Sequence, residues 1–134
     1  MRRVYTETVV DHATHPRNTG SIADADGFVS ITTADGDAIR LWLRVEDDRV
    51  VAAAFLIRAC AATIAALSVL TELIRGRTVA GAMAVGQGDV LEALGGLPEG
   101  NVHCARLAAD TLRAALRDYL VVKREPWRKS YRRY

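Results

Sequence analysis

The chain has 134 residues, of which 50% are hydrophobic and 25% are charged, and its formal net charge is +2. This composition is typical of one globular domain that is large enough to form its own core without the support of disulfides or a metal. No apolar run reaches the roughly 20 residues that cross a bilayer, and the first residues lack the apolar stretch of a signal peptide. With two cysteines and no export signal, we expect reduced thiols, no membrane partner and a cytoplasmic location.

The first half of the chain predicts one short helix followed by three strands. The helix covers Tyr5–His12 and ends before a loop that contains proline and glycine. Alternating apolar and polar residues predict strands over Phe28–Thr33 and Ile39–Glu46, and a Val- and Ala-rich run predicts a third strand over Arg49–Ile57. Short turns join them, which indicates an antiparallel meander with one covered face. Trp42 falls on the polar face, where either a helix or a partner protein would cover it.

The second half predicts helices. They cover Ala61–Arg75, Val79–Val85, Asp89–Leu94 and Cys104–Leu120, and Gly95–Gly100 forms a loop between the last two. Strands followed by helices predict an α+β fold, with a three-stranded antiparallel sheet (meander) packed against a layer of about four to five helices.

The C-terminal end is basic. Residues 123–134 carry six basic side chains and one acidic one, which gives this segment a charge of +5 and leaves the rest of the chain with −3. Its aromatic residues Trp127, Tyr131 and Tyr134 could stack on nucleic-acid bases, but such a charge run is usually a solvated tail or a contact for an acidic protein. We therefore expect a domain over residues 1–122, a basic tail over residues 123–134, and no nucleic-acid partner.

Four side chains are candidate metal ligands: Asp35, Cys60, His103 and Cys104. Both cysteines lie at the start of a predicted helix, where free N–H groups and the positive end of the helix dipole stabilise a thiolate. Asp35 lies in the first hairpin, Cys60 follows the last strand, and the other two begin the last helix, so a helix layer on a sheet could bring all of them to one end. Two sulfurs, an imidazole and a carboxylate suit tetrahedral zinc, and three cysteines with a histidine would suit a labile iron–sulfur cluster.

Each candidate also has a purely structural interpretation. Asp35 and Gly36 form a dipeptide typical of hairpin turns, so Asp35 is as well explained by turn chemistry as by metal binding. Free cysteines are commonly small core residues, and His103 could simply cap its helix. His12 and His15 have a spacing that could hold a metal, but a structural or solvated role is expected for this pair.

A series of short motifs runs through nearly all of the predicted domain. They are Asp11-His12, Pro16-Arg17-Asn18-Thr19-Gly20, Gly36-Asp37, Cys60 followed by Ala65-Ala66-Leu67-Ser68, Leu70-Thr71-Glu72, Gly76-Arg77-Thr78, Leu97-Pro98, and His103-Cys104 with Leu107-Ala108 and Asp110. No single motif is specific, but in their order and spacing they resemble the IscU/NifU N-terminal type of iron–sulfur cluster assembly scaffold.

This resemblance implies a SufE/NifU-like fold and a scaffold or carrier rather than an enzyme. Such a scaffold binds iron and a [2Fe-2S] cluster, accepts sulfur from a cysteine desulfurase and passes the cluster to apo iron–sulfur client proteins. By position, Cys60 and Cys104 correspond to cluster ligands and His103 to an auxiliary ligand. Cys104 also matches the main persulfide acceptor, and Asp37 matches an acidic residue beside the site that tunes the lability of the cluster.

The chain departs from the family pattern at three places. Asp35 stands where the family has its first cysteine, and Ala59 stands where a glycine precedes the second. Leu97–Asn101 differs from the Leu-Pro-Pro-Val-Lys loop that a dedicated Hsp70 binds, which weakens the expectation of an Hsp70 or J-type chaperone partner. Since a carboxylate is harder than a thiolate, the exchange at Asp35 keeps zinc or mononuclear iron plausible and weakens the hold on a cluster.

Two alternative functions follow from these departures. The chain could be a zinc-bound persulfide acceptor, similar to a sulfurtransferase, with Zn²⁺ in place of a cluster. It could also be a degenerate member of the family that works as a regulatory interaction module. The interval from Gly76 to His103 shows no insertion, which favours the IscU branch over the longer, zinc-dependent SufU sulfurtransferases.

Overall fold

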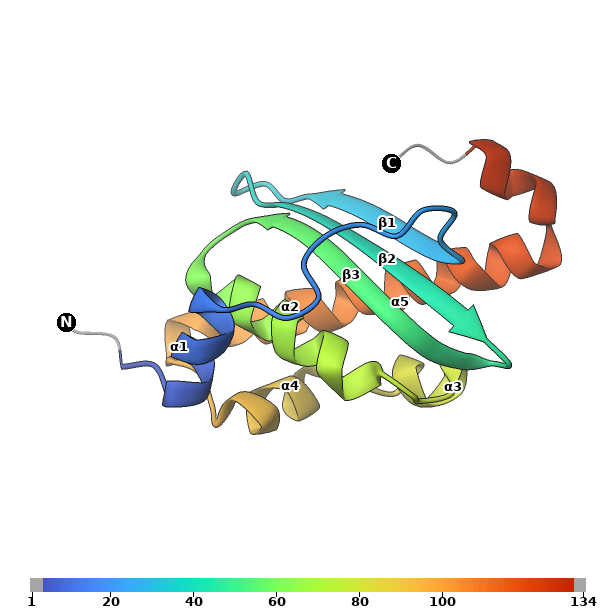
Figure 1. Cartoon of the computed structure of the whole chain (residues 1–134). Coiled ribbons are helices and arrows are strands. Elements are labelled where there is room, and N and C mark those ends of the chain that lie inside the picture. The colour runs from blue at the N-terminus through green and yellow to red at the C-terminus, as the bar shows by residue number, and fades with distance from the viewer. Residues whose placement is uncertain (1–3, 132–134) are drawn as a thin grey trace.

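The computed structural model describes residues 4–131 and has a three-stranded sheet with five α-helices and two short 3-10 helices (Figure 1). The α+β meander predicted from the sequence is confirmed. In chain order the elements are α1 (Glu7–Thr14), β1 (Gly27–Thr32), β2 (Ala38–Glu46), β3 (Arg49–Arg58), α2 (Ala61–Ile74), α3 (Val79–Met83), α4 (Gln87–Leu94), η1 (Glu99–Asn101), α5 (Val102–Arg124) and η2 (Pro126–Tyr131).

The sheet has the order β1-β2-β3, and both pairs are antiparallel. Because successive side chains of a strand point to opposite faces, Ile39, Leu41 and Leu43 lie on one face, where each is at most 1% exposed. The turn between β2 and β3 consists of Asp47 and Asp48, which have φ angles of 49° and 62°. Two positive φ angles in a two-residue turn match the twist of the strands that it joins.

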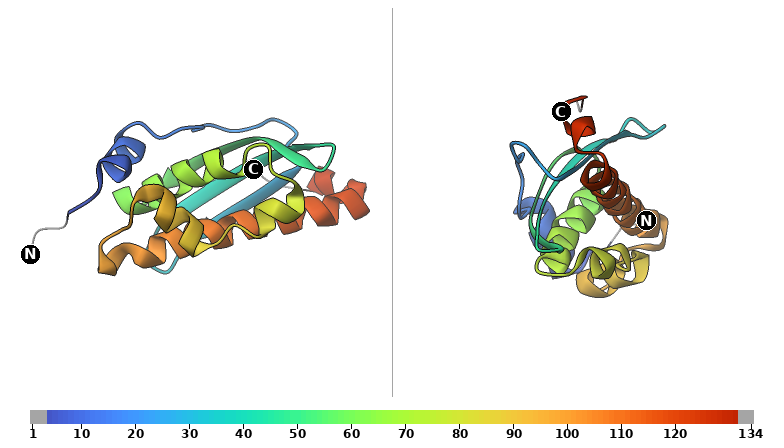
Figure 2. Two further views of the ribbon diagram at one scale, coloured as in Figure 1. Left: turned by 90° about the horizontal axis from the view of Figure 1, so that it is seen from below. Right: turned by 90° about the vertical axis from the view of Figure 1, so that its right-hand side faces the viewer.

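Helices α2 and α5 cover the apolar face of the sheet (Figure 2). The core residues of α2 include Leu67, Leu70 and Ile74, each at most 1% exposed. Helix α5 begins two residues before the predicted start and ends four residues after the predicted end, because the turn η1 leads directly into it and its amphipathic pattern continues to Arg124. None of the helices within residues 4–131 is both long and apolar enough to cross a membrane.

The opposite face of the sheet is partly covered by the chain itself. Trp42 is 3% exposed and packs against Phe28, with ring centroids 5.3 Å apart, and against Ala25. The segment of residues 21–26 therefore covers Trp42, so neither of the two predicted coverings, a helix or a partner protein, is needed. Just before this segment, Thr19 forms a parallel bridge with Phe55, which shields the outer edge of β3 from pairing with another chain.

The basic C-terminal segment is ordered as far as it is described. Residues 126–131 form η2, and the Lys129 Nζ atom lies 3.0 Å from Asp24 Oδ1 and 3.7 Å from Asp26 Oδ1. Trp127 is 61% exposed. Tyr134, which was considered above for nucleic-acid stacking, lies outside the described residues.

Candidate functional site

Three segments that are distant in the sequence meet at one end of the molecule. They are the β1–β2 hairpin, the end of β3 with the start of α2, and the start of α5 (Figure 1). This is the arrangement that would bring the predicted ligands together. Of the four predicted ligand side chains, Cys60, His103 and Cys104 lie close together, whereas Asp35 lies apart from them.

Cys60 and Cys104 form the centre of the site. Cys60 is the N-cap residue of α2 and is exposed, whereas Cys104 lies in the first turn of α5 and is 1% exposed. Their Sγ atoms are 3.9 Å apart. Two thiolates bound to one tetrahedral metal at about 2.3 Å would have sulfurs roughly 3.8 Å apart. The pair is therefore already spaced for a shared metal ion.

The two thiols have opposite ionisation tendencies. Partial burial opposes ionisation of Cys60, but hydrogen bonds from the Thr63 side chain and backbone, from Cys104 and from the Ala62 backbone outweigh it and lower the Cys60 pKa. For Cys104, burial is the largest effect and raises the pKa, and the adjacent Cys60 adds to the rise. These directions favour Cys60 over Cys104 as the thiol that ionises first in the metal-free protein.

His103 lies beside the sulfur pair, and Asp35 lies apart from it. The exposed His103 has its Nε2 atom 3.7 Å from Cys104 Sγ. Asp35 is the exposed third residue of the turn that begins at Thr33, and its carboxylate makes no hydrogen bond or ion pair with the described part of the chain. Within residues 4–131, no three His, Cys, Asp or Glu side chains are arranged to hold a metal ion as they stand. A bound metal would therefore draw His103, Asp35 or both toward the sulfurs.

The hairpin that carries Asp35 is fixed by its own backbone. The N–H of Gly36 donates to the carbonyl of Thr33 at 3.0 Å, and Gly36 has a φ of 89°, which a glycine adopts without strain. Asp37 is half-buried, and its N–H donates to the Thr33 hydroxyl at 3.1 Å. The turn thus holds the backbone of Asp35 and Asp37 while the Asp35 carboxylate stays free to bind.

Two polar residues of the site were missed in the sequence analysis. Thr63 and Asn101 are 1% and 4% exposed, and both side chains form hydrogen bonds that lower the pKa of Cys104. The Thr63 Oγ1 atom is also 3.3 Å from Cys60 Sγ. The signal for Thr63 was available, since it is a hydroxyl residue three positions after a helix N-cap in an otherwise apolar run. For Asn101 no such signal exists in the sequence.

Several of the motif residues hold the fold together instead of lining the site. His12 is 5% exposed, with Nδ1 2.7 Å from the Ser68 hydroxyl and Nε2 3.4 Å from a Glu72 carboxylate oxygen. Because a carboxylate only accepts, Nε2 carries the hydrogen of the neutral ring and Ser68 donates to Nδ1. Ser68 in turn accepts from the N–H of Arg17 at 2.8 Å. The expected structural role of His12 fits this buried network, and the exposed His15 lies outside it.

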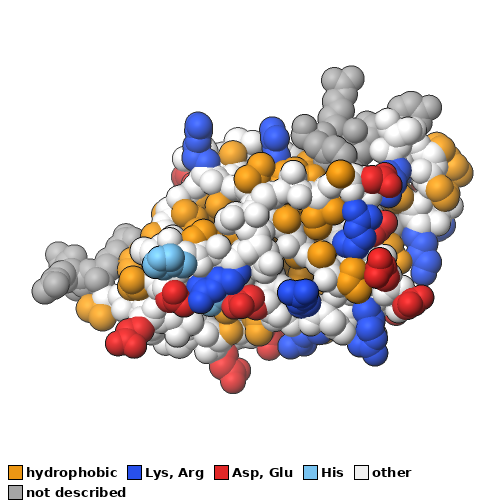
Figure 3. Space-filling model, in the orientation of Figure 1, with side chains coloured by type: hydrophobic (Ala, Val, Ile, Leu, Met, Phe, Trp, Pro, Cys, Tyr) orange, Lys and Arg blue, Asp and Glu red, His pale blue; other side chains and the backbone are white. Residues whose placement is uncertain are grey.

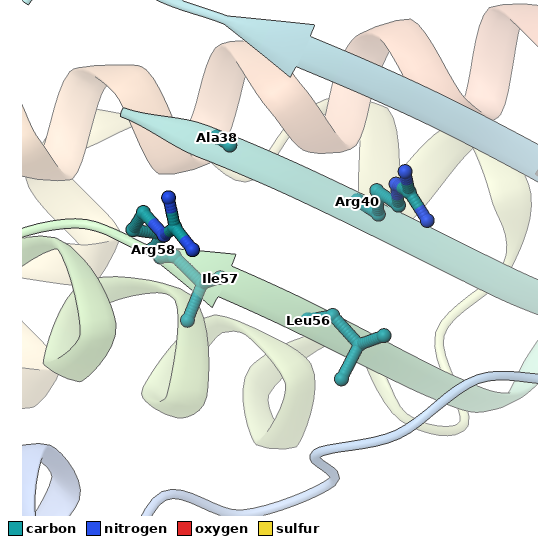
Figure 4. A pocket seen from close by; sticks show the side chains of 5 residues that line it. All are labelled: Ala38, Arg40, Leu56, Ile57 and Arg58. Carbon is teal, nitrogen blue, oxygen red and sulfur yellow. The ribbon is translucent and has the colours of Figure 1, made fainter. Parts of the chain in front are cut away.

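A second feature lies on the outer face of the sheet. Arg40 of β2 and Leu56 and Arg58 of β3 line a shallow hollow of about 260 Å³ (Figure 4). Neither arginine forms an ion pair with the described residues, and Leu56 is 47% exposed. Elsewhere on this side of the molecule, acidic, basic and hydrophobic side chains are interspersed (Figure 3). The lining of this hollow has no thiol, imidazole or carboxylate, so it lacks the candidate metal ligands that surround the sulfur pair.

Comparison with known proteins identifies the family of this chain. The family model described as the NifU-like N-terminal domain matches residues 4–125. The iron–sulfur cluster assembly scaffold protein IscU 1 of Archaeoglobus fulgidus is 42% identical over 117 residues, which cover 87% of this chain and 76% of that protein. The scaffold protein IscU of Escherichia coli is 36% identical over 121 residues, which cover 86% of this chain and 93% of that protein.

Solved structures agree with this comparison at the level of the fold. A structure described as an iron–sulfur cluster assembly scaffold protein for the SUF system, from Fervidobacterium islandicum, superposes with a TM-score of 0.68 at 24% identity. The match covers 84% of this chain and 96% of that one. The N-terminal part of a NifU-like protein from Brucella abortus gives a TM-score of 0.66 at 19% identity, over 87% of this chain and 94% of that one.

Proposed function

The chain belongs to the family of NifU-like N-terminal domains, and we propose that it is an iron–sulfur cluster assembly scaffold of the cytoplasm. In this role it accepts sulfur from a cysteine desulfurase, holds iron and sulfide as a [2Fe-2S] cluster, and passes the cluster to apo client proteins. The cluster is its cargo, so the chain acts as a carrier and not as an enzyme with turnover.

The observation that carries this proposal is the pair of cysteine sulfurs 3.9 Å apart at the accessible end of the sheet. Cys60 and Cys104 would be the permanent ligands, because each is fixed at the start of a helix. His103 and Asp35 would complete the ligand set from exposed positions. Because these two side chains are exposed, they can rotate away from the metal, which suits a site that must release its cluster to a client protein.

Sulfur transfer fits the same two cysteines. A thiolate of this chain would attack the outer sulfur of the persulfide on the desulfurase, forming a new S–S bond while the desulfurase keeps its cysteine as the thiolate. Cys104 corresponds by position to the family's acceptor, but it is 1% exposed and must move to be reached. The exposed Cys60, with its lowered pKa, supports an alternative in which it receives the sulfur first.

Anaerobic reconstitution tests the proposal. The chain would be incubated with ferrous iron, cysteine, a cysteine desulfurase and dithiothreitol, which reduces the transferred persulfide sulfur to sulfide, and its visible absorption and acid-labile sulfide would be measured. A scaffold gains colour and equal amounts of iron and sulfide, and Cys60→Ala and Cys104→Ala remove both. A colourless wild-type chain without labile sulfide would exclude cluster assembly and leave the zinc-bound persulfide acceptor and the regulatory interaction module.

The spacing of the sulfurs also fits one zinc ion, which supports the zinc-bound persulfide acceptor as the second candidate. That protein would bind about one zinc per chain and gain the mass of a sulfur atom after incubation with desulfurase and cysteine. Mass spectrometry of the separated cysteine peptides shows which thiol carries the sulfur. A colourless zinc protein that gains this mass would replace the scaffold proposal with the second candidate.

A further inference from the structure

The Thr63 hydroxyl is buried against the two cysteine sulfurs. Thr63 is the third residue of α2 and is 1% exposed, and its Oγ1 atom lies 3.3 Å from Cys60 Sγ. The same side chain forms a hydrogen bond with Cys104, which comes from the opposite helix. One hydroxyl therefore contacts both sulfurs, although Thr63 itself is not a candidate metal ligand.

Other helical threonines of the chain have a different hydrogen-bond partner for the hydroxyl. Thr14, Thr71 and Thr111 each donate the hydroxyl hydrogen to a backbone carbonyl of their own helix, at 2.7, 2.6 and 2.8 Å respectively. Such bonds satisfy a helical hydroxyl locally. Within residues 4–131, the hydroxyl of Thr63 instead has only the two sulfurs as hydrogen-bond partners.

A neutral thiol is a poor partner for a buried hydroxyl, whereas a thiolate is a strong acceptor. The surroundings in α2 are apolar, with Ala62, Ala65 and Ala66 all buried, so packing alone would be satisfied by valine at position 63. The hydroxyl is thus placed to act on sulfur that carries negative charge, as it does when bound to a metal.

We propose that Thr63 is a positioning residue that donates its one hydroxyl hydrogen to a metal-bound sulfur, that of Cys60 or of Cys104, and so strengthens the hold of the sulfur pair on the metal cargo. This inference rests on the proposed function. It also addresses the departure at Asp35, because a site with one thiolate fewer gains from a hydrogen bond that stabilises the two that remain. Hydrogen bonds to ligand sulfur also tune the reduction potential of a cluster.

Cobalt binding to the metal-free protein tests the inference without a cluster. Co²⁺ would be titrated into wild type, Thr63→Val and Thr63→Ser, and the sulfur-to-cobalt absorption band would report binding. Loss of an outer-shell partner typically lowers metal affinity 10- to 100-fold, so we expect a decrease of about 10-fold in Thr63→Val. Thr63→Ser, which keeps the hydroxyl, should stay near wild type. Wild-type affinity in the valine variant, or an equal loss in the serine variant, would overturn the inference.

A second measurement uses the reconstituted cluster. In Thr63→Val the cluster should have a lower reduction potential and be lost faster to a chelator, and Thr63→Ser should restore both values. Unchanged values in the valine variant would count against the inference even if the cobalt data agreed with it. If no variant assembles a cluster but cobalt affinity still depends on the hydroxyl, the scaffold proposal fails while the role of Thr63 at the sulfur pair stands. A wild-type chain that binds no cobalt would overturn the inference directly.

Discussion

The two cysteines lie 3.9 Å apart but differ in accessibility and ionisation. Cys60 is exposed with a lowered pKa, and Cys104 is 1% exposed with a raised pKa. Since the thiolate is the nucleophile, we expect iodoacetamide to modify Cys60 at least about 10-fold faster than Cys104 in the metal-free protein at pH 7. Mass spectrometry of the two cysteine peptides over time measures both rates. Equal rates would mean that the site opens fully in solution, and urea-unfolded protein gives the reference in which burial no longer protects Cys104.

Asp35 can be tested as a ligand because its carboxylate has no structural partner among the described residues. Asparagine is as compatible with the turn as aspartate, but it is a much weaker metal ligand. We expect Asp35→Asn to lower the affinity for Co²⁺ by about 10-fold while the free energy of unfolding of the metal-free protein changes by less than about 0.5 kcal/mol. Cobalt titration and urea unfolding measure the two quantities. Unchanged cobalt affinity would make Asp35 a turn residue only.

At the scale of elements, the contact between β1 and α5 depends on the absence of a side chain at Gly27. A Cβ atom there would lie 2.6 Å from the carbonyl oxygen of Ala115 and 3.2 Å from Cβ of Tyr119. Because backbone atoms cannot rotate away, Gly27→Ala must push the strand from the helix, and we expect it to cost about 2 kcal/mol of stability. Urea unfolding with circular dichroism measures this cost.

Gly88 supplies the matched control for this substitution. It is the second residue of α4, and a Cβ atom there would meet no heavy atom within 4 Å. Alanine is preferred over glycine by about 1 kcal/mol in a helix interior, so Gly88→Ala in the first turn should stabilise the protein by less than that. A loss of stability in Gly88→Ala, or none in Gly27→Ala, would contradict the packing described here.

The elements could be predicted because their patterns are local, whereas the site depends on contacts between distant residues. Alternation located the first two strands and a Val- and Ala-rich run the third, all to within one residue at each end, and the strong helix patterns located α2 and α5. The cysteines were identified from their positions at helix starts. Thr63 forms a hydrogen bond with Cys104, 41 positions away, and Ser68 forms one with His12, 56 positions away. No periodic pattern in the sequence reveals contacts between residues so far apart. Trp42 was ambiguous for the same reason, since the segment that covers it has no regular structure.

At the scale of the whole molecule, the His12 network attaches the N-terminal helix to the domain. His12 joins α1 to Ser68 and Glu72 of α2, and Ser68 also holds the N–H of Arg17 in the loop after α1. Burial lowers the pKa of His12 and so favours the neutral imidazole, in which Nε2 carries the hydrogen and Ser68 donates to Nδ1. Attachment of α1 should therefore weaken when His12 takes up a proton.

The pKa of His12 gives the direction of this effect. Burial, the largest cause, and the nearby positive charge of Arg17 lower the pKa from 6.5, while Glu72 and Asp11 act in the opposite direction with less effect. The unfolded chain thus binds a proton at His12 at higher pH than the folded protein does. The contribution of His12 to the free energy of unfolding is therefore fully present above pH 6.5. It is lost as the pH falls toward the lower pKa of the folded state, because protons then bind preferentially to the unfolded chain.

Replacing His12 by glutamine removes this titration while keeping a polar side chain. We expect His12→Gln to lower the free energy of unfolding at pH 7.5 by about 1 kcal/mol, the typical loss for a buried hydrogen bond, and to reduce its dependence on pH between 7.5 and 5.5. Urea unfolding of both proteins at the two pH values gives the four free energies needed. His15→Gln is the control, because its side chain is 81% exposed and outside the network. If wild type and His12→Gln lost equal stability on acidification, His12 would not be the group that couples protonation to the attachment of α1.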